Sequence, residues 1–130
     1  MPEAAKKRIL LAEDDDSMRR FIGVILKQAG YEIVAADDGI EAMKIVFEMD
    51  IDAVIADALM PKLSGYELCR ILRNDPAKSI IPLIIISGFE RRKKERPETN
   101  IADLFLTKDA KLKENLLSGI ASLLQPAENA

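Results

Sequence analysis

Five short apolar runs alternate with longer segments whose apolar residues recur at helical spacing, and this alternation constrains the fold more than any other feature. Each run is bounded by turn or charged residues, as buried parallel strands are. The predicted strands are residues 9–12, 33–36, 53–56, 83–86 and 104–106. Because helices between parallel strands form right-handed crossovers, the sequence predicts an α/β fold in which a doubly wound five-stranded parallel sheet is covered on both faces.

Two amphipathic segments fill the first two intervals between these strands. In the first, apolar residues fall at i, i+3, i+4, i+7, i+8 and i+11, and Gly30 supplies the stop. These residues are Met18, Phe21, Ile22, Ile25, Leu26 and Ala29. The second helix is predicted after Gly39, and its apolar residues are Ile40, Met43, Ile45, Val46 and Phe47.

The later helices are marked by a start signal and by one apolar stripe. Ser64 and Glu67 form a capping-box pattern at the start of the third helix, which ends before Pro76. The last helix is predicted to place Leu112, Leu116, Ile120, Leu123 and Leu124 on one stripe. Between the fourth and fifth strands, residues 90–100 carry a charged run with almost no apolar stripe. We interpret them as a solvated, partly helical surface and the least ordered internal region, with a docking patch for an acidic partner as the alternative.

Length and charge exclude several classes of protein. At 130 residues and 48% hydrophobic, the chain suits one domain, residues 1–130, with a core over about 7–124 and flexible tails. Lys+Arg 19 against Asp+Glu 22 leaves a net charge of −3, too balanced for a protein that binds nucleic acid directly. No apolar stretch approaches the roughly 20 residues of a membrane span, and the N-terminus lacks a signal-peptide core. We therefore expect a cytoplasmic protein.

The absence of histidine narrows the possible chemistry. With His 0, histidine triads and histidine metal sites are excluded, so acid–base work falls to carboxylates and lysines. The one cysteine, Cys69, permits no internal disulfide, and it lies on the apolar stripe of a predicted helix. It is expected to be a small core residue.

Polar side chains follow four of the predicted strands, where a doubly wound sheet binds its ligands. The first strand is followed by Glu13, Asp14, Asp15 and Asp16, the third by Asp57, the fourth by Ser87, and the fifth by Thr107 and Lys108. Because the carboxyl ends of neighbouring parallel strands meet at one edge, we expect these side chains to converge.

The acids of this edge predict a metal site. Two carboxylates about 4 Å apart repel by roughly 4 kcal/mol at an effective dielectric constant near 20, so Glu13, Asp14 and Asp57 should take up protons or recruit a cation. Oxygen ligands favour a hard cation, Mg²⁺ before Ca²⁺. Asp15 and Asp16 are expected instead to cap the first helix and to compensate its dipole.

Four segments then carry a pattern that covers nearly the whole chain. They are residues 9–15 (ILLAEDD), 57–61 (DALMP) followed by Gly65, 85–88 (IISG), and Thr107 with Lys108. In order and spacing they resemble the successive signatures of the response-regulator receiver family, including its chemotaxis-type single-domain members. The resemblance implies the flavodoxin-like receiver fold, with strand order 2-1-3-4-5.

The resemblance also implies a role for each matching residue. It makes Asp57 the phosphoacceptor, Asp14 a direct Mg²⁺ ligand and Glu13 a ligand through water. It makes the backbone carbonyl of Leu59 a further metal ligand. Two more residues would act on the phosphoryl group itself: Ser87 by a hydrogen bond and Lys108 by charge.

The implied function is that of a phosphoacceptor in two-component signalling, and not of an enzyme in the usual sense. The donor would be a histidine kinase or a histidine phosphotransfer protein. A downstream protein target would bind the face formed by the fourth helix, fifth strand and fifth helix, and self-association is possible. Phe105 falls at the aromatic switch position of the family, and Ser87 would move with it; an ordinary core or rim aromatic is the equal alternative for Phe105. Leu59 and Phe89 flank the path of the hydrolytic water in that family, which predicts slow autodephosphorylation.

The sequence departs from the family pattern at several positions. Asp109 stands where the family usually has a proline joined by a cis bond, so a trans bond or a strained loop is expected there. Ile101 replaces a glycine, and the expected fourth helix is unusually polar.

Three other functions are alternatives to that of a phosphoacceptor. A flavodoxin-like cofactor carrier lacks support because no Ser/Thr/Gly-rich phosphate loop follows the first strand. An aspartate-nucleophile phosphatase would want its nucleophile and a second acid two residues apart after that strand, together with a cap domain, and neither is evident. A degenerate receiver that acts only as a phosphorylation-independent interaction module is the serious alternative.

Overall fold

One parallel sheet forms the centre of the computed structural model, which describes residues 6–88 and 101–124. The sheet has the order β2-β1-β3-β4-β5 and is built from β1 (Arg8–Ala12), β2 (Glu32–Ala36), β3 (Ala53–Asp57), β4 (Leu83–Gly88) and β5 (Leu104–Lys108). The strand order and the parallel pairing confirm the predicted fold. The predictions for residues 90–100 and for Phe89 fall outside the described residues.

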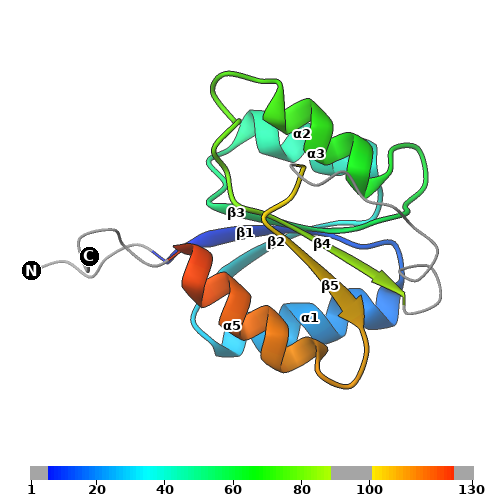
Figure 1. Ribbon diagram of the computed structural model, residues 1–130, viewed down its shortest axis with the longest axis vertical. Coiled ribbons are helices and arrows are strands. Elements are labelled where there is room, and N and C mark those ends of the chain that lie inside the picture. The colour runs from blue at the N-terminus through cyan, green and yellow to red at the C-terminus, as the bar shows by residue number, and fades with distance from the viewer. Residues whose placement is uncertain (1–5, 89–100, 125–130) are drawn as a thin grey trace, which may run out of the picture.

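Helices cover both faces of this sheet. As Figure 1 shows, α2 (Gly39–Glu48) and α3 (Gly65–Arg73) lie on one face, and α1 (Asp16–Gln28) and α5 (Leu112–Leu124) lie on the other. This arrangement is the doubly wound architecture that alternating strands and helices predict.

The two faces of the sheet are separated by the alternation of side chains along each strand. In β1, Leu10 and Ala12 join the core under α2 and α3, whereas Ile9 and Leu11 join the core with α1 and α5. Cys69 is fully buried in the first of these cores, as predicted, and burial raises the pKa of its thiol to about 12. The thiol therefore stays protonated and serves packing.

The edge strands differ from the prediction that all five strands are buried. Strand β5 is half-buried along its whole length, and β2 is buried only at Ala36. An edge strand has a neighbour on one side only, so its side chains retain contact with solvent even where helices cover the sheet. Apolar character alone did not distinguish these strands from central ones.

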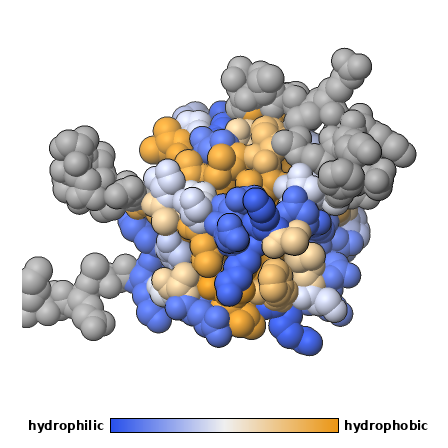
Figure 2. All heavy atoms as spheres, turned by 60° about the horizontal axis from the view of Figure 1, so that its bottom comes forward, coloured by the Kyte–Doolittle hydropathy of each residue, from blue (hydrophilic) through white to orange (hydrophobic). Residues whose placement is uncertain are grey.

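Two aromatic residues also differ from the predicted apolar stripes. Phe21 on α1 and Phe47 on α2 are each 46% exposed, and Val24 on α1 is 47% exposed. Ile22, Ile25 and Leu26 already fill the width of α1 that faces the sheet, so Phe21 lies beside the stripe. The side of the molecule that carries α1 and α5 mixes hydrophobic and hydrophilic residues (Figure 2).

The helix termini follow the predicted caps. Asp15 caps α1 by accepting a hydrogen bond from the backbone N–H of Met18 at 2.7 Å. Ser64 and Glu67 form both hydrogen bonds of the capping box at α3. Gly30, with φ of 102°, follows α1 in the left-handed region that favours glycine. No helix in the described part of the chain has the length and apolarity to cross a membrane.

Candidate functional site

The sheet register brings the polar strand ends to a single edge. Ala12 of β1 pairs with Ala56 of β3, so Glu13 and Asp57 leave the sheet at the same level. Asp57 in turn pairs with Ile86 of β4, one residue before Ser87. Lys108 ends β5, where it pairs with Gly88. The convergence predicted from the sequence is therefore confirmed.

Three carboxylates form the centre of this site. One oxygen from each of Glu13, Asp14 and Asp57 lies within 4.8 Å of the others. Glu13 is fully buried and Asp57 is 4% exposed, whereas Asp14 is exposed. Such a group pays a high electrostatic cost unless protons or cations compensate it.

Lys108 supplies part of that compensation. Its Nζ lies 2.9 Å from Oε1 of Glu13 and 3.3 Å from Oδ2 of Asp57. The other oxygen of Asp57, Oδ1, is buried and accepts no hydrogen bond from the described residues. An ionised oxygen without a hydrogen-bond partner in a buried site is costly, so a ligand at Oδ1 would be stabilising.

The pKa values reflect this balance of burial and charge. Burial raises the pKa of Glu13 to about 7 although Lys108 opposes the rise, and nearby Asp57 adds to it. Burial also raises the pKa of Asp57, against the attraction of Lys108. For Lys108 itself, burial lowers the pKa, but contacts with Glu13 and Asp57 outweigh this and leave the pKa raised. Lys108 is thus held in its charged form.

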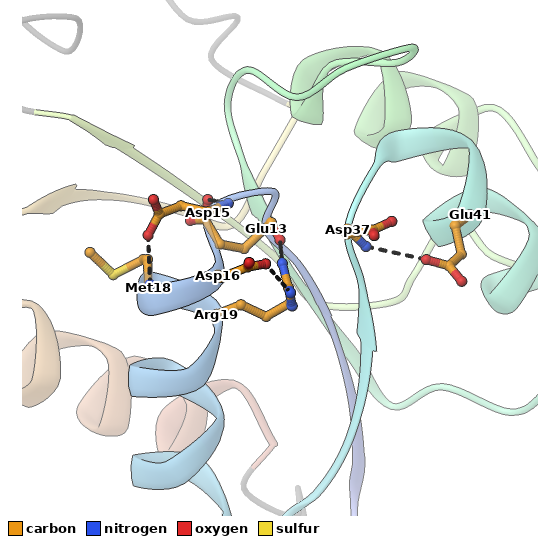
Figure 3. A network of polar contacts seen from close by, with 7 residues as sticks. All are labelled: Glu13, Asp15, Asp16, Met18, Arg19, Asp37 and Glu41. Atoms are coloured by element: carbon orange, nitrogen blue, oxygen red, sulfur yellow. Dashed lines mark hydrogen bonds and ion pairs between the residues drawn. The ribbon is translucent and has the colours of Figure 1, made fainter.

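Hydrogen bonds hold both the backbone and the side chain of Glu13. Its N–H donates to the carbonyl of Ala36 at 3.1 Å, and its Oε2 accepts from the N–H of Asp15 at 3.1 Å. Its carbonyl oxygen accepts from Nη1 of Arg19 at 2.8 Å, and Nη2 of Arg19 pairs with Asp16. Figure 3 shows Arg19 reaching from α1 to the backbone carbonyl of Glu13 and to the carboxylate of Asp16. Arg19 is not among the residues predicted for the site, because helical spacing relates it to Asp16 but gives no reason for a contact with Glu13.

The backbone of the loop after Asp57 lies in close contact with two glycines. A Cβ on Gly65 would collide with the carbonyl of Asp57, and a Cβ on Gly39 would collide with the carbonyl of Leu63. Within this loop Lys62 adopts φ of 72°, and its Nζ lies 3.4 Å from Oδ2 of Asp38, the N-cap of α2. The N-terminus of α2 therefore shapes the loop that contains Leu59.

The remaining predicted site residues lie around this centre. Ser87 is buried at the end of β4, and Thr107 pairs with it in the sheet register. Phe105 on β5 is half-buried and packs against the core on the α2 and α3 side. The side chain of Leu59 is 46% exposed. The peptide bond between Lys108 and Asp109 is trans, as expected without a proline.

The donor set fits a small, hard cation. Its side-chain ligand atoms are carboxylate oxygens, which Mg²⁺ prefers, and only three side chains contribute, which leaves positions for water and a phosphate. Oδ1 of Asp57, which has no hydrogen-bond partner within residues 6–88 and 101–124, supports the same conclusion, because a bound cation would satisfy it.

A family model and curated relatives match most of this chain. The family model described as the response regulator receiver domain matches residues 9–120. A probable transcriptional regulator, ycf27 of Cyanophora paradoxa, is 37% identical over 128 residues, which are 98% of this chain and 52% of that protein. The chain spans about half or less of the length of the first curated relatives that it matches.

Solved structures share the fold over almost the whole chain. The chemotaxis response regulator CheY4 of Vibrio cholerae is 26% identical, with a TM-score of 0.82 and coverage of 92% of this chain and 100% of that one. The response regulator TrrA of Thermotoga maritima, solved in complex with Mg²⁺-BeF, is 30% identical, with a TM-score of 0.80 and coverage of 91% and 99%. This chain belongs to the family of response regulator receiver domains of two-component systems.

Proposed function

We propose that the chain accepts a phosphoryl group on Asp57 from a phosphohistidine of a histidine kinase or phosphotransfer protein, or from a small donor such as acetyl phosphate. Receiver domains are signalling phosphoacceptors and not enzymes in the usual sense. The observation that carries the proposal is Asp57 itself: a buried carboxylate at a strand end, with Oδ2 near Lys108 and Oδ1 without a hydrogen-bond partner among the described residues.

The transfer needs little covalent chemistry from the protein. A carboxylate oxygen of Asp57 attacks phosphorus in line, the new P–O bond forms as the P–N bond to the histidine breaks, and the electron pair leaves with the imidazole nitrogen. Catalysis is then positioning and charge stabilisation. Lys108, held charged at the site, pairs with the phosphoryl oxygens, and the hydroxyl of Ser87 donates a hydrogen bond to one of them.

Glu13, Asp14, Asp57 and the backbone carbonyl of Leu59 would hold Mg²⁺. When bound, the cation supplies positive charge that neutralises the phosphoryl oxygens in the transition state. Without a cation, the three carboxylates would repel the negatively charged phosphoryl donor. By holding the metal, the same acidic residues would bring the metal and the donor to one place.

Two experiments test this function. Incubation with acetyl phosphate and Mg²⁺, followed by intact mass measurement, should show one phosphoryl adduct that Asp57→Asn abolishes. Asp37→Asn is the matched control, because Asp37 is an exposed acid that follows β2 at the same edge. An unmodified wild-type protein, or an adduct that survives Asp57→Asn, would contradict the proposal and favour a phosphorylation-independent interaction module.

The metal ligands are tested by titration with Mg²⁺. Asp14→Ala should weaken Mg²⁺ binding far more than Asp16→Ala, because the side chain of Asp14 belongs to the three-carboxylate cluster and that of Asp16 pairs with Arg19. Equal losses of affinity would mean that the ligands are assigned out of register.

Phosphorylation is proposed to act through the surface around β5 and α5. The new group would draw Ser87 toward it, and Phe105 on the neighbouring strand could then change its packing and bias binding of a protein target. A pull-down with phosphorylated and unphosphorylated protein, repeated with Phe105→Leu, tests this. If the set of captured proteins is the same in both states, phosphorylation does not control the output.

A further inference from the structure

We propose that Arg19 is a positioning residue for the metal-ligating turn formed by Glu13 and Asp14. The inference rests on the proposed metal site and adds to it a residue outside the ligand set. Arg19 lies in the first two turns of α1, and its guanidinium bridges two groups: the carbonyl oxygen of Glu13 at 2.8 Å and the carboxylate of Asp16 (Figure 3).

The turn is short, so each of its peptide groups matters. β1 ends at Ala12 and α1 begins at Asp16, which leaves three residues to connect strand and helix. The carbonyl that Arg19 contacts belongs to the peptide plane between Glu13 and Asp14. Because a peptide unit is planar, holding this oxygen fixes the direction in which the chain enters Asp14, and so the direction of its carboxylate.

Other contacts within the described part of the chain hold the groups on either side of this peptide plane. Glu13 is anchored through its N–H to Ala36 and through its carboxylate to Asp15 and Lys108. Asp15 is anchored as the cap of α1. Asp14 is the exposed member of the carboxylate cluster, so its position depends on the backbone on either side.

An arginine suits this task because its planar fork can donate to two acceptors at once. The side chain of Arg19 is 24% exposed, whereas its partner Asp16 is 81% exposed. Asp16 therefore orients a guanidinium that is itself partly enclosed against the end of β1. A lysine would keep the charge at position 19 but could not make both contacts in this geometry.

Positioning and plain electrostatics predict opposite results for the loss of Arg19. Removing a positive charge beside a cation site should tighten Mg²⁺ binding if charge alone matters. If Arg19 orients the ligands, its loss should weaken binding, and the loss of such supporting contacts typically costs about 10- to 100-fold in metal affinity.

The test is a calorimetric titration of the full chain with Mg²⁺ for Arg19→Met, Arg19→Lys and Arg20→Met. Arg20 is the matched control, because it is the next residue on α1, carries the same charge and is exposed. We expect about 10- to 100-fold weaker binding for Arg19→Met, weakened binding for Arg19→Lys, and an affinity close to that of wild type for Arg20→Met. Asp16→Asn should give a smaller loss, since it only orients Arg19.

Denaturant unfolding in EDTA separates positioning from a merely structural role. A structural role would lower the free energy of unfolding and leave the Mg²⁺ affinity of the folded protein unchanged. Unchanged or tighter binding in Arg19→Met, or an equal loss in Arg20→Met, would overturn the inference. Should Arg19→Met fail to fold, Arg19→Lys with wild-type affinity would overturn it instead. If wild-type protein binds no Mg²⁺, the metal assignment itself fails, and the two failures are thereby distinguished.

Discussion

Nζ of Lys108 lies 2.9 Å from Oε1 of Glu13, a proposed metal ligand, and 3.3 Å from Oδ2 of Asp57, the proposed phosphoacceptor. The ammonium group thus compensates both buried acids in the absence of a cation. Release of Glu13 to a metal would leave Lys108 free to pair with Asp57 and the incoming phosphoryl group. We therefore expect Lys108 to have two roles, which can be separated by mutation.

Lys108→Met should slow phosphorylation by acetyl phosphate and leave Mg²⁺ binding intact or stronger. The rate should fall about 10²-fold or more, because a charge that stabilises the transition state is lost. Mg²⁺ binding should not suffer, because a competing cation is removed from Glu13. Intact mass over time and calorimetry measure the two effects. Lys111→Met, an exposed lysine nearby, is the control, and a parallel loss of metal affinity would contradict this separation of roles.

The stability of the metal-free protein should fall as the pH rises from about 4.5 to about 7. Burial raises the pKa of Glu13 in the folded state, so the folded protein binds more protons than the unfolded chain in this window. Stability therefore decreases with pH there, by up to about 3 kcal/mol for a shift of this size. Asp57, with its pKa also raised, acts in the same direction.

Denaturant unfolding in EDTA at a series of pH values measures this dependence. Glu13→Gln, which cannot ionise, should flatten the curve between pH 4.5 and 7, whereas the exposed Glu114→Gln should not. A Glu13→Gln curve that is as steep as that of wild type would show that Glu13 keeps an ordinary pKa.

Gly39→Ala and Gly23→Ala should change stability in opposite directions. A Cβ on Gly39 would collide with the carbonyl of Leu63, so the loop after Asp57 must shift, at a cost of about 1–3 kcal/mol. A Cβ on Gly23, inside α1, meets open space, and alanine there should stabilise the helix by about 0.5–1 kcal/mol. Chemical denaturation of both variants checks the pair, and a neutral Gly39→Ala would mean that α2 and the loop separate easily.

Phosphorylated protein should lose its phosphoryl group slowly. The apolar side chain of Leu59 is 46% exposed next to the site and cannot orient a water molecule for in-line attack. Leu59→Asn together with Phe89→Glu should speed the decay after removal of the donor, and each tenfold change needs only about 1.4 kcal/mol. Val24→Asn, a matched polar substitution of an exposed apolar residue on α1, should leave the decay unchanged. A double mutant that decays at the wild-type rate would show that the apolar side chains at positions 59 and 89 do not slow hydrolysis.

The order of the elements and the identity of the acidic residues follow from the sequence alone. The apolar runs at residues 53–56 and 83–86 predict strands, because buried parallel strands must be apolar on both faces. The structure extends these strands to Asp57 and Gly88. The caps at Asp15 and Ser64 are equally local, since each contact spans only three residues. Such features depend on neighbours in the chain, and a pattern of residue types records them.

Only the tertiary structure decided how these parts meet. It placed Lys108 closer to Glu13 than to Asp57, turned Arg19 back onto β1, and brought Gly39 against Leu63. It also left Phe21 and the edge strands partly exposed. These outcomes depend on which connecting helix packs against which strand, and on how far individual side chains reach between the two. No local period encodes such distances, because they are set by residues that the fold brings together from far apart in the chain.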